Sequence, residues 1–182
     1  MTNGVVFMIQ GSKHWNQLVV AVYSLSKYYN GRVCLIAGDD EGEEVSDKIQ
    51  AEAANLDLDI SVLRWDAPTR GKTGKSGQAY ANKCEMGRLT PFDQSIFLDA
   101  DVLVVDSLDD LWPKVREVKL TSFADWVTTG NLVGKRIAGW KDVCPDEYKM
   151  MSEKPYPAIN TGVIGFCRYS TFMDDWKATT NR

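Results

Sequence analysis

Short apolar runs alternate with segments of helical spacing up to Val105, and this alternation constrains the fold more than any other feature. The runs are rich in β-branched and aromatic residues, which predicts buried strands at Val5–Gln10, Arg32–Gly38, Ile60–Asp66 and Ser95–Val105. Helices are expected between them, over His14–Tyr29, from the acidic stretch after Gly38 to about Asn55, and over Ser76–Leu89. The alternation predicts an α/β fold, with a mostly parallel sheet, helices on both faces, and ligands bound at the carboxyl ends of the strands.

Beyond Val105 the expected elements become shorter. A short helix is expected at Ser107–Trp112, and strands are expected at Val118–Ala124 and Ala158–Phe166. Between these two strands, Asp125–Pro157 forms a long excursion that contains several glycines and prolines. We expect residues 1–182 to form a single domain.

The composition limits the classes of partner. The chain is 44% apolar and 25% charged, and its net charge of −4 with a pI of about 5.1 argues against nucleic acids and anionic membranes. No apolar run approaches the roughly 18 residues that a membrane span needs, and the first residues lack the features of a signal peptide. The cysteines form no C-x-x-C pair, so we expect reduced thiols and a cytoplasmic location; they are Cys34, Cys84, Cys144 and Cys167.

Two aspartates, Asp99 and Asp101, interrupt an otherwise apolar run in the fourth expected strand. A buried carboxylate is costly unless a cation or hydrogen-bond donors accompany it. On a strand, residues i and i+2 lie on one side, about 6.5–7 Å apart, where two carboxylates can share Mg²⁺ or Mn²⁺. In the alternative interpretation the strand ends at Leu98 and the aspartates lie in a turn.

Two chemistries use an Asp-x-Asp motif after a hydrophobic strand. In haloacid-dehalogenase-like phosphatases the first aspartate attacks a phosphate, but that motif normally lies on the first strand, whereas Asp99 follows the fourth. In the second chemistry the aspartates hold a metal ion that binds the diphosphate of a nucleotide-sugar.

The residues around the motif favour the second chemistry. Ala81–Trp112 contains a lysine, Lys83, then "LTPF", a hydrophobic strand, "LDAD" and a "DLW" ending. "AINTGVIGF" follows later in the chain, after an acidic residue, Asp125. This pattern resembles the glycogenin-like, family 8 glycosyltransferases. The resemblance implies a GT-A fold, a Rossmann-like and mostly parallel sheet with helices on both faces.

The resemblance also implies an activity and a metal site. It implies a retaining hexosyltransferase that uses Mn²⁺ or Mg²⁺ and a nucleotide-sugar, most simply a UDP-sugar. By resemblance, Asp99 and Asp101 bind the metal, and Asp99 also contacts the donor ribose, with Ala100 between them in the donor site. Lys83 would hold the phosphate or the donor sugar. The alternative for Lys83 is an exposed helix lysine.

The same resemblance assigns the remaining donor contacts. Asp125 and Asn160 would hydrogen-bond hydroxyl groups of the donor sugar, and Gly162 would allow a close approach of the backbone. The loop after the first strand, with Gln10, Gly11 and His14, would meet the nucleobase; these three residues complete the predicted site. The imidazole of His14 replaces the aromatic ring that the family usually places there, and a surface histidine is the alternative.

The chain also departs from the family pattern. No Asp-Gln pair follows Asn160, and there is no histidine besides His14, so a third metal ligand and a phosphate-binding lysine near the C-terminus are missing. Either the sequence is truncated before these elements, or the protein is a naturally minimal or degenerate member. A non-catalytic nucleotide-sugar-binding remnant is therefore an alternative to an enzyme. The acceptor is an unknown sugar, lipid or protein, and a homodimer is a possible state.

A basic loop lies between the third expected strand and the helix that carries Lys83. Arg70–Gln78, "RGKTGKSGQ", contains two Gly-Lys-Ser/Thr tripeptides, but the first glycine of G-x-x-x-x-G-K-[ST] is absent in both registers, which excludes a Walker loop. Two interpretations stay open. The loop is either a solvated linker or a basic lip that brings Lys72 and Lys75 to the donor diphosphate.

Overall fold

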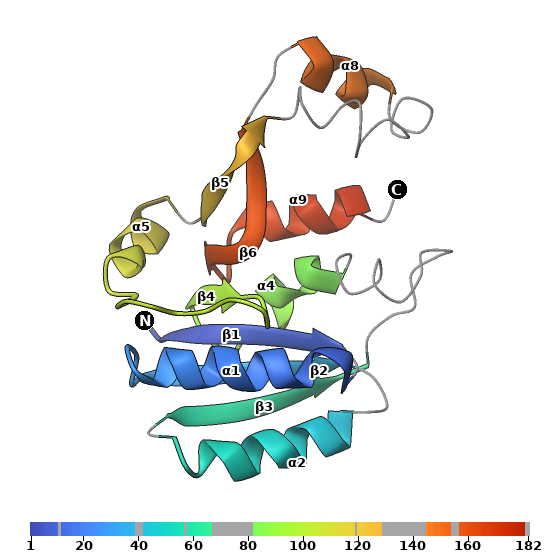
Figure 1. Ribbon diagram of the computed structural model, residues 1–182. Coiled ribbons are helices and arrows are strands. Elements are labelled where there is room, and N and C mark those ends of the chain that lie inside the picture. The colour runs from blue at the N-terminus through green and yellow to red at the C-terminus, as the bar shows by residue number, and fades with distance from the viewer. Residues whose placement is uncertain are drawn as a thin grey trace. The chain divides into compact units, whose positions relative to one another are not determined.

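A computed structural model places the four predicted strands of the first half in one parallel sheet. These strands are β1 (Asn3–Gln10), β2 (Arg32–Gly38), β3 (Asp59–Trp65) and β4 (Gln94–Leu98). The strand order is β3-β2-β1-β4-β6, and β6 (Pro157–Cys167) runs antiparallel to β4 (Figure 1). The predicted mostly parallel α/β sheet is confirmed.

The structure describes residues 1–10, 12–38, 42–56, 58–66, 82–118, 120–128, 145–153 and 157–180. They fall into two units, one formed by Met1–Thr121 with Gly162–Arg182 and the other by Ser122–Thr161. The second unit contains α8 (Pro145–Glu153) and most of β5 (Leu120–Thr128), which neighbours β6. Within the described ranges, no helix combines the length and the apolar character that crossing a bilayer requires.

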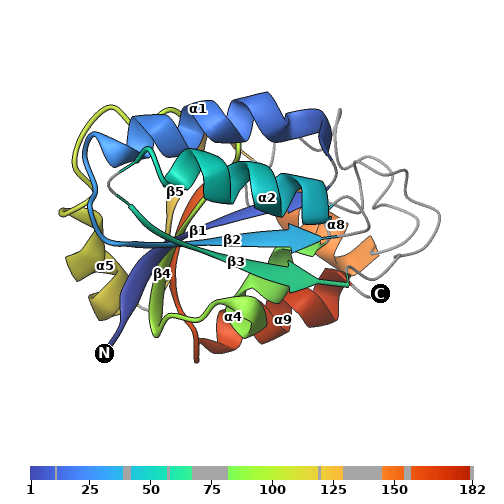
Figure 2. The same ribbon diagram turned by 90° about the horizontal axis from the view of Figure 1, so that it is seen from below.

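Both faces of β1 are buried. Val5, Val6 and Phe7 are all fully inaccessible, as expected for an inner strand of a parallel sheet. Figure 2 shows α1 (Trp15–Ser26) and α2 (Gly42–Ala53) on one side of the sheet, and α4 (Met86–Leu89) and α9 (Thr171–Thr180) on the other. Val5 and Phe7 belong to the core under α1, whereas Val6 belongs to the core that includes α4 and α9. Alternate residues of one strand therefore join two cores.

The fourth strand is shorter than the sequence predicts. β4 ends at Leu98, and Asp99 begins a turn that the Val102 N–H closes by donating to the Asp99 carbonyl at 3.1 Å. The expected strand up to Val105 is therefore wrong, and the alternative of a turn at the aspartates is right. Residues 102–105 show the alternating burial of a strand without being part of the sheet. Val104 is buried, whereas Leu103 and Val105 on either side of it are exposed. The Val104 N–H donates to Ser24 Oγ at 3.0 Å.

Other boundaries differ from the expectation by a few residues. The expected helix at Ser107–Trp112 begins later, as α5 (Leu111–Val118), because a turn precedes it. A 3-10 turn, η1 (Ser12–His14), leads into α1. Of the helix expected over Ser76–Leu89, the structure describes the end, as η2 (Lys83–Glu85) and α4. The basic loop "RGKTGKSGQ" lies outside the described residues.

A hydroxyl pair connects α4 to β4. Thr90 and Ser95 are fully buried, and their side-chain oxygens lie 2.7 Å apart. Thr90 Oγ1 also accepts a hydrogen bond from the Phe92 N–H at 3.2 Å. The "LTPF" segment thus forms a satisfied buried turn, because each hydroxyl has a partner where water cannot reach.

An aromatic pair joins the end of α1 to α5. The rings of Tyr29 and Trp112 are tilted by 32° with centroids 6.3 Å apart. The Tyr29 hydroxyl donates to the Arg32 carbonyl at 3.2 Å. Burial raises the pKa of Tyr29 from 10.0 to about 12. The folded chain therefore keeps this proton at a pH at which an unfolded chain releases it.

This difference predicts a loss of stability at alkaline pH. Between about pH 10 and about pH 12 the unfolded chain ionises at Tyr29 while the folded chain does not, so the free energy of unfolding falls as the pH rises. Urea unfolding over this range should show a shallower fall for Tyr29→Phe than for the wild type. Tyr169→Phe, on a side chain that is 81% exposed, is the matched control. Equal slopes for wild type and Tyr29→Phe would contradict the interpretation.

Candidate functional site

The carboxyl ends of the parallel strands surround a cavity of about 320 Å³ in the first unit. Twelve residues line it: Met8, Ile9, Gln10, Lys13, His14, Gln17, Gly38, Trp65, Lys83, Asp99, Ala100 and Asp101. Parallel α/β sheets bind ligands at the carboxyl ends of their strands, where the strands meet the loops that follow them, and the cavity lies at that end. It brings six predicted site residues together: Gln10, His14, Lys83, Asp99, Ala100 and Asp101.

An ion pair between Lys83 and Asp99 lines this cavity. The Lys83 ammonium is 2.6 Å from Asp99 Oδ1 and 2.7 Å from Oδ2. The Lys83 side chain is 9% exposed and that of Asp99 is 26% exposed. Lys83 comes from η2, while Asp99 is the first residue after β4. Lys83 is therefore a buried residue with a carboxylate partner, and the alternative of an exposed helix lysine is wrong.

Opposing effects act on the Asp99 carboxyl group. Burial raises the pKa of Asp99 above its ordinary value, the hydrogen bond and charge of Lys83 lower it, and the charge of Asp101 raises it again. The net direction is upward, so the solvation that the Asp99 carboxylate loses on burial outweighs the stabilisation that Lys83 gives it. Asp101 lies two residues further on, in the turn, and is exposed.

The carboxylates of Asp99 and Asp101 supply part of what a divalent cation requires. Mg²⁺ and Mn²⁺ accept one or two protein carboxylates when substrate phosphates and water complete the shell. Asp101 fits this role as an exposed oxygen donor, whereas both oxygens of Asp99 also face Lys83. Among the residues that the structure describes, no group of three His, Cys, Asp or Glu side chains could hold a metal alone. The residues fit a cation that a bound phosphate helps to hold.

Polar side chains line the other end of the cavity. Asn82 Nδ2 donates to Gln10 Oε1 at 3.2 Å, which links η2 to the end of β1. His14 Nδ1 lies 2.6 Å from Gln17 Oε1 on an exposed surface, so the ring is orientated by its own helix. Gly11, the third predicted residue of this loop, lies outside the described residues.

The sequence interpretation missed six residues of the lining: Met8, Ile9, Lys13, Gln17, Gly38 and Trp65. Trp65 ends β3, and Lys13 and Gln17 lie on η1 and α1. The rule that ligands bind at the carboxyl ends of parallel strands would have found Trp65, because it closes the third predicted strand. Lys13 and Gln17 carried no comparable signal.

Three further predicted residues lie on β5 and β6. Asp125 is in β5 and Asn160 in β6, both in the second unit, and their side chains lie outside what the structure describes. Gly162 belongs to the first unit, and its carbonyl accepts a hydrogen bond from the Asp99 N–H at 2.8 Å. Gly162 therefore lies directly beside the Asp99 turn, as a backbone neighbour.

A larger hollow, of about 690 Å³, lies at the amino ends of the strands, near Tyr29, Gly31 and Trp112. We assign the site to the smaller cavity because the paired carboxylate and the strand ends converge there. A larger volume alone does not identify a binding site, which also needs converging polar groups.

Solved structures with a similar fold belong to glycosyltransferases. The chain aligns over 97% of its length with the galactosyltransferase LgtC, solved in complex with donor and acceptor sugar analogues, at a TM-score of 0.61 and 20% identity. It aligns over 96% with an active-site mutant of LgtC, at a TM-score of 0.60 and 20% identity. It aligns over 98% with the glycosyltransferase GlyE of Streptococcus pneumoniae TIGR4, at a TM-score of 0.55 and 13% identity.

The chain has a GT-A fold. It spans 64%, 59% and 37% of the lengths of those three chains, respectively. No family model matches the sequence, and no curated protein is significantly similar to it. The similarity therefore establishes the GT-A fold, and the activity has to be argued from the residues of the site.

The Lys83–Asp99 pair predicts how the site responds to substitution. Lys83→Met should lower the free energy of unfolding by about 1–3 kcal/mol, because it leaves a partly buried carboxylate without its ammonium. Adding Asp99→Asn should recover part of the loss, since the amide carries no charge. Urea unfolding of both single variants and the double variant measures the coupling. Strictly additive effects would show that the pair contributes no interaction energy.

Proposed function

We propose that the protein is a metal-dependent, retaining glycosyltransferase that transfers a hexose from a UDP-sugar to an acceptor. Its family would be the glycogenin-like family 8, which the "LDAD" segment resembles. The observation that carries the proposal is the Lys83–Asp99–Asp101 arrangement at the carboxyl ends of the strands in a GT-A fold. The acceptor is a sugar, lipid or protein.

Lys83 and the two aspartates serve the diphosphate end of the donor. Lys83 already holds Asp99 at 2.6 Å, so a phosphate that enters the cavity meets an ammonium whose position is set. Asp99 orients Lys83 and, with its neighbour Ala100, would contact the ribose, while the exposed carboxylate of Asp101 would supply an oxygen ligand to the cation. When bound, Mn²⁺ or Mg²⁺ would neutralise charge on the diphosphate leaving group.

The polar end of the cavity serves the nucleoside. Gln10, which accepts a hydrogen bond from Asn82, would face the base together with His14. Gly11 of the same loop remains part of the proposed base contact. Trp65 offers an indole ring in the same lining, which adds a stacking surface to the predicted imidazole. Asp125 and Asn160 would hydrogen-bond hydroxyl groups of the transferred sugar, and Gly162 would leave room beside Asp99 for it.

The phosphatase alternative receives less support from these observations. An attacking aspartate needs an oxygen that can reach phosphorus, whereas both Asp99 oxygens face Lys83. The proposed cellular location is the cytoplasm, and the absence of a disulfide at Cys34, Cys84 and Cys167 is compatible with a reducing compartment.

Calorimetry with UDP, with and without Mn²⁺, tests the proposal. The wild type should bind UDP more tightly with Mn²⁺, and Asp101→Ala should lose the Mn²⁺-dependent part, because its carboxylate supplies an oxygen ligand. Asp109→Ala is the matched control, since Asp109 lines the larger hollow at the amino ends of the strands. This control should bind UDP as the wild type does.

The outcomes separate the candidate functions. Absence of Mn²⁺-dependent UDP binding in the wild type would overturn the transferase proposal. Binding of UDP-sugars without hydrolysis or transfer would identify a non-catalytic nucleotide-sugar-binding remnant. A phosphorylated Asp99, detected by mass spectrometry after exposure to phosphate esters, would instead identify a phosphatase.

A further inference from the structure

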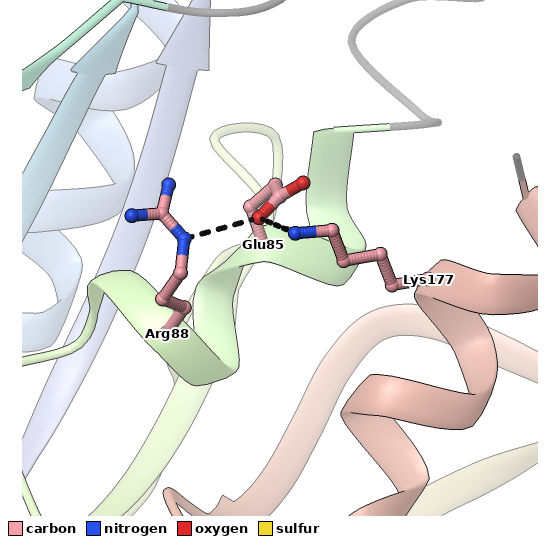
Figure 3. A network of polar contacts seen from close by, with 3 residues as sticks. All are labelled: Glu85, Arg88 and Lys177. Carbon is pink, nitrogen blue, oxygen red and sulfur yellow. Dashed lines mark hydrogen bonds and ion pairs between the residues drawn. The ribbon is translucent and has the colours of Figure 1, made fainter.

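A second buried carboxylate lies close to Lys83 in the chain. Glu85 is 3% exposed, and its Oε2 lies 3.0 Å from Lys177 Nζ and 3.3 Å from Arg88 Nε (Figure 3). Arg88 is a local partner, three residues away, and its side chain is 61% exposed. Lys177 comes from α9, 92 residues further along the chain. One contact of Glu85 is therefore a long-range anchor between two segments.

The same short turn carries both charged groups. Lys83, Cys84 and Glu85 form η2, and all three are buried. Lys83 reaches Asp99 after β4, whereas Glu85 reaches Lys177 on α9. Three residues leave little freedom for one side chain to move without the other, because the backbone of the turn is shared. The position of Lys83 thus depends on what holds Glu85.

Close packing reinforces the anchor. A Cβ atom added at Gly87 would lie 2.7 Å from Cβ of Met173, so α9 packs directly on the backbone of α4, which follows η2. Met173 is 3% exposed and belongs to the same core as Met86. The contact between Met173 and Gly87 therefore limits how closely α9 approaches α4, and it keeps Lys177 of α9 within reach of Glu85 in η2.

We propose that the Glu85–Lys177 ion pair is a positioning device for Lys83, and that Lys177 is a positioning residue of the donor site. This inference rests on the proposed function only for the identity of the ligand. Glu85 cannot swing outward without leaving its charge partners, and its burial makes an unpaired state costly. The pair therefore fixes η2, and η2 fixes the ammonium that would meet the diphosphate.

The reactivity of Lys83 tests this directly. In Lys177→Met, acetylation of Lys83 by acetic anhydride, followed by mass spectrometry, should accelerate severalfold, and the dissociation constant for UDP with Mn²⁺ should rise about tenfold. Lys177→Arg should restore both, because its guanidinium also binds a carboxylate. Arg32→Met, which breaks an exposed pair with Asp59, is the matched control and should change neither.

A double variant separates positioning from stability. Glu85→Gln with Lys177→Met removes the buried charge together with its partner, so urea unfolding should show stability recovered relative to Lys177→Met alone. Lys83 should nevertheless stay reactive, because the Glu85–Lys177 ion pair no longer connects η2 to α9. Wild-type reactivity of Lys83 in Lys177→Met, or its full recovery in the double variant, would overturn the proposal. If the wild type binds no UDP, the proposed function fails while the acetylation rates still decide the role of Lys177.

Discussion

The burial of β1 on both faces is the constraint on which the rest of the structure depends. Three consecutive side chains, Val5, Val6 and Phe7, are fully inaccessible, and each contributes on the order of 1.5–3 kcal/mol when removed from water. Such a strand has no position for a polar functional group along its length. Polar chemistry is therefore confined to the ends of the strands, and the cavity with Gln10 lies at the carboxyl end of β1.

The Lys83–Asp99 pair connects this sheet to the layer of helices beneath it. Asp99 is the first residue beyond β4, and its N–H still continues the ladder to Gly162. Its carboxylate then requires a cation, and Lys83 supplies one from η2. Through Glu85 the same turn reaches Lys177 on α9. A chain of charge pairs thus runs from the end of the sheet to a helix that is remote in sequence.

The GT-A fold and the chemistry of the site are separate conclusions. Similar backbones occur in LgtC and GlyE at 20% identity or less, so they establish the arrangement of strands and helices. The cavity lining includes Trp65, Lys13 and Gln17, which the family resemblance did not assign. The proposed activity depends on these side chains and on Asp101, and the fold alone does not imply it.

The sequence by itself determined the α/β class and the four parallel strands, and it predicted Lys83, Asp99 and Asp101 as site residues. Hydrophobic periodicity is a local property, and Asp-x-Asp after an apolar run is visible without coordinates. The sequence could not determine where β4 ends, because residues 102–105 are all apolar and β-prone, as in a buried strand. Nor could it pair Lys83 with Asp99 or Glu85 with Lys177. Those partners lie 16 and 92 residues apart, and only the packing of α9 and the register of the sheet bring them within hydrogen-bond distance.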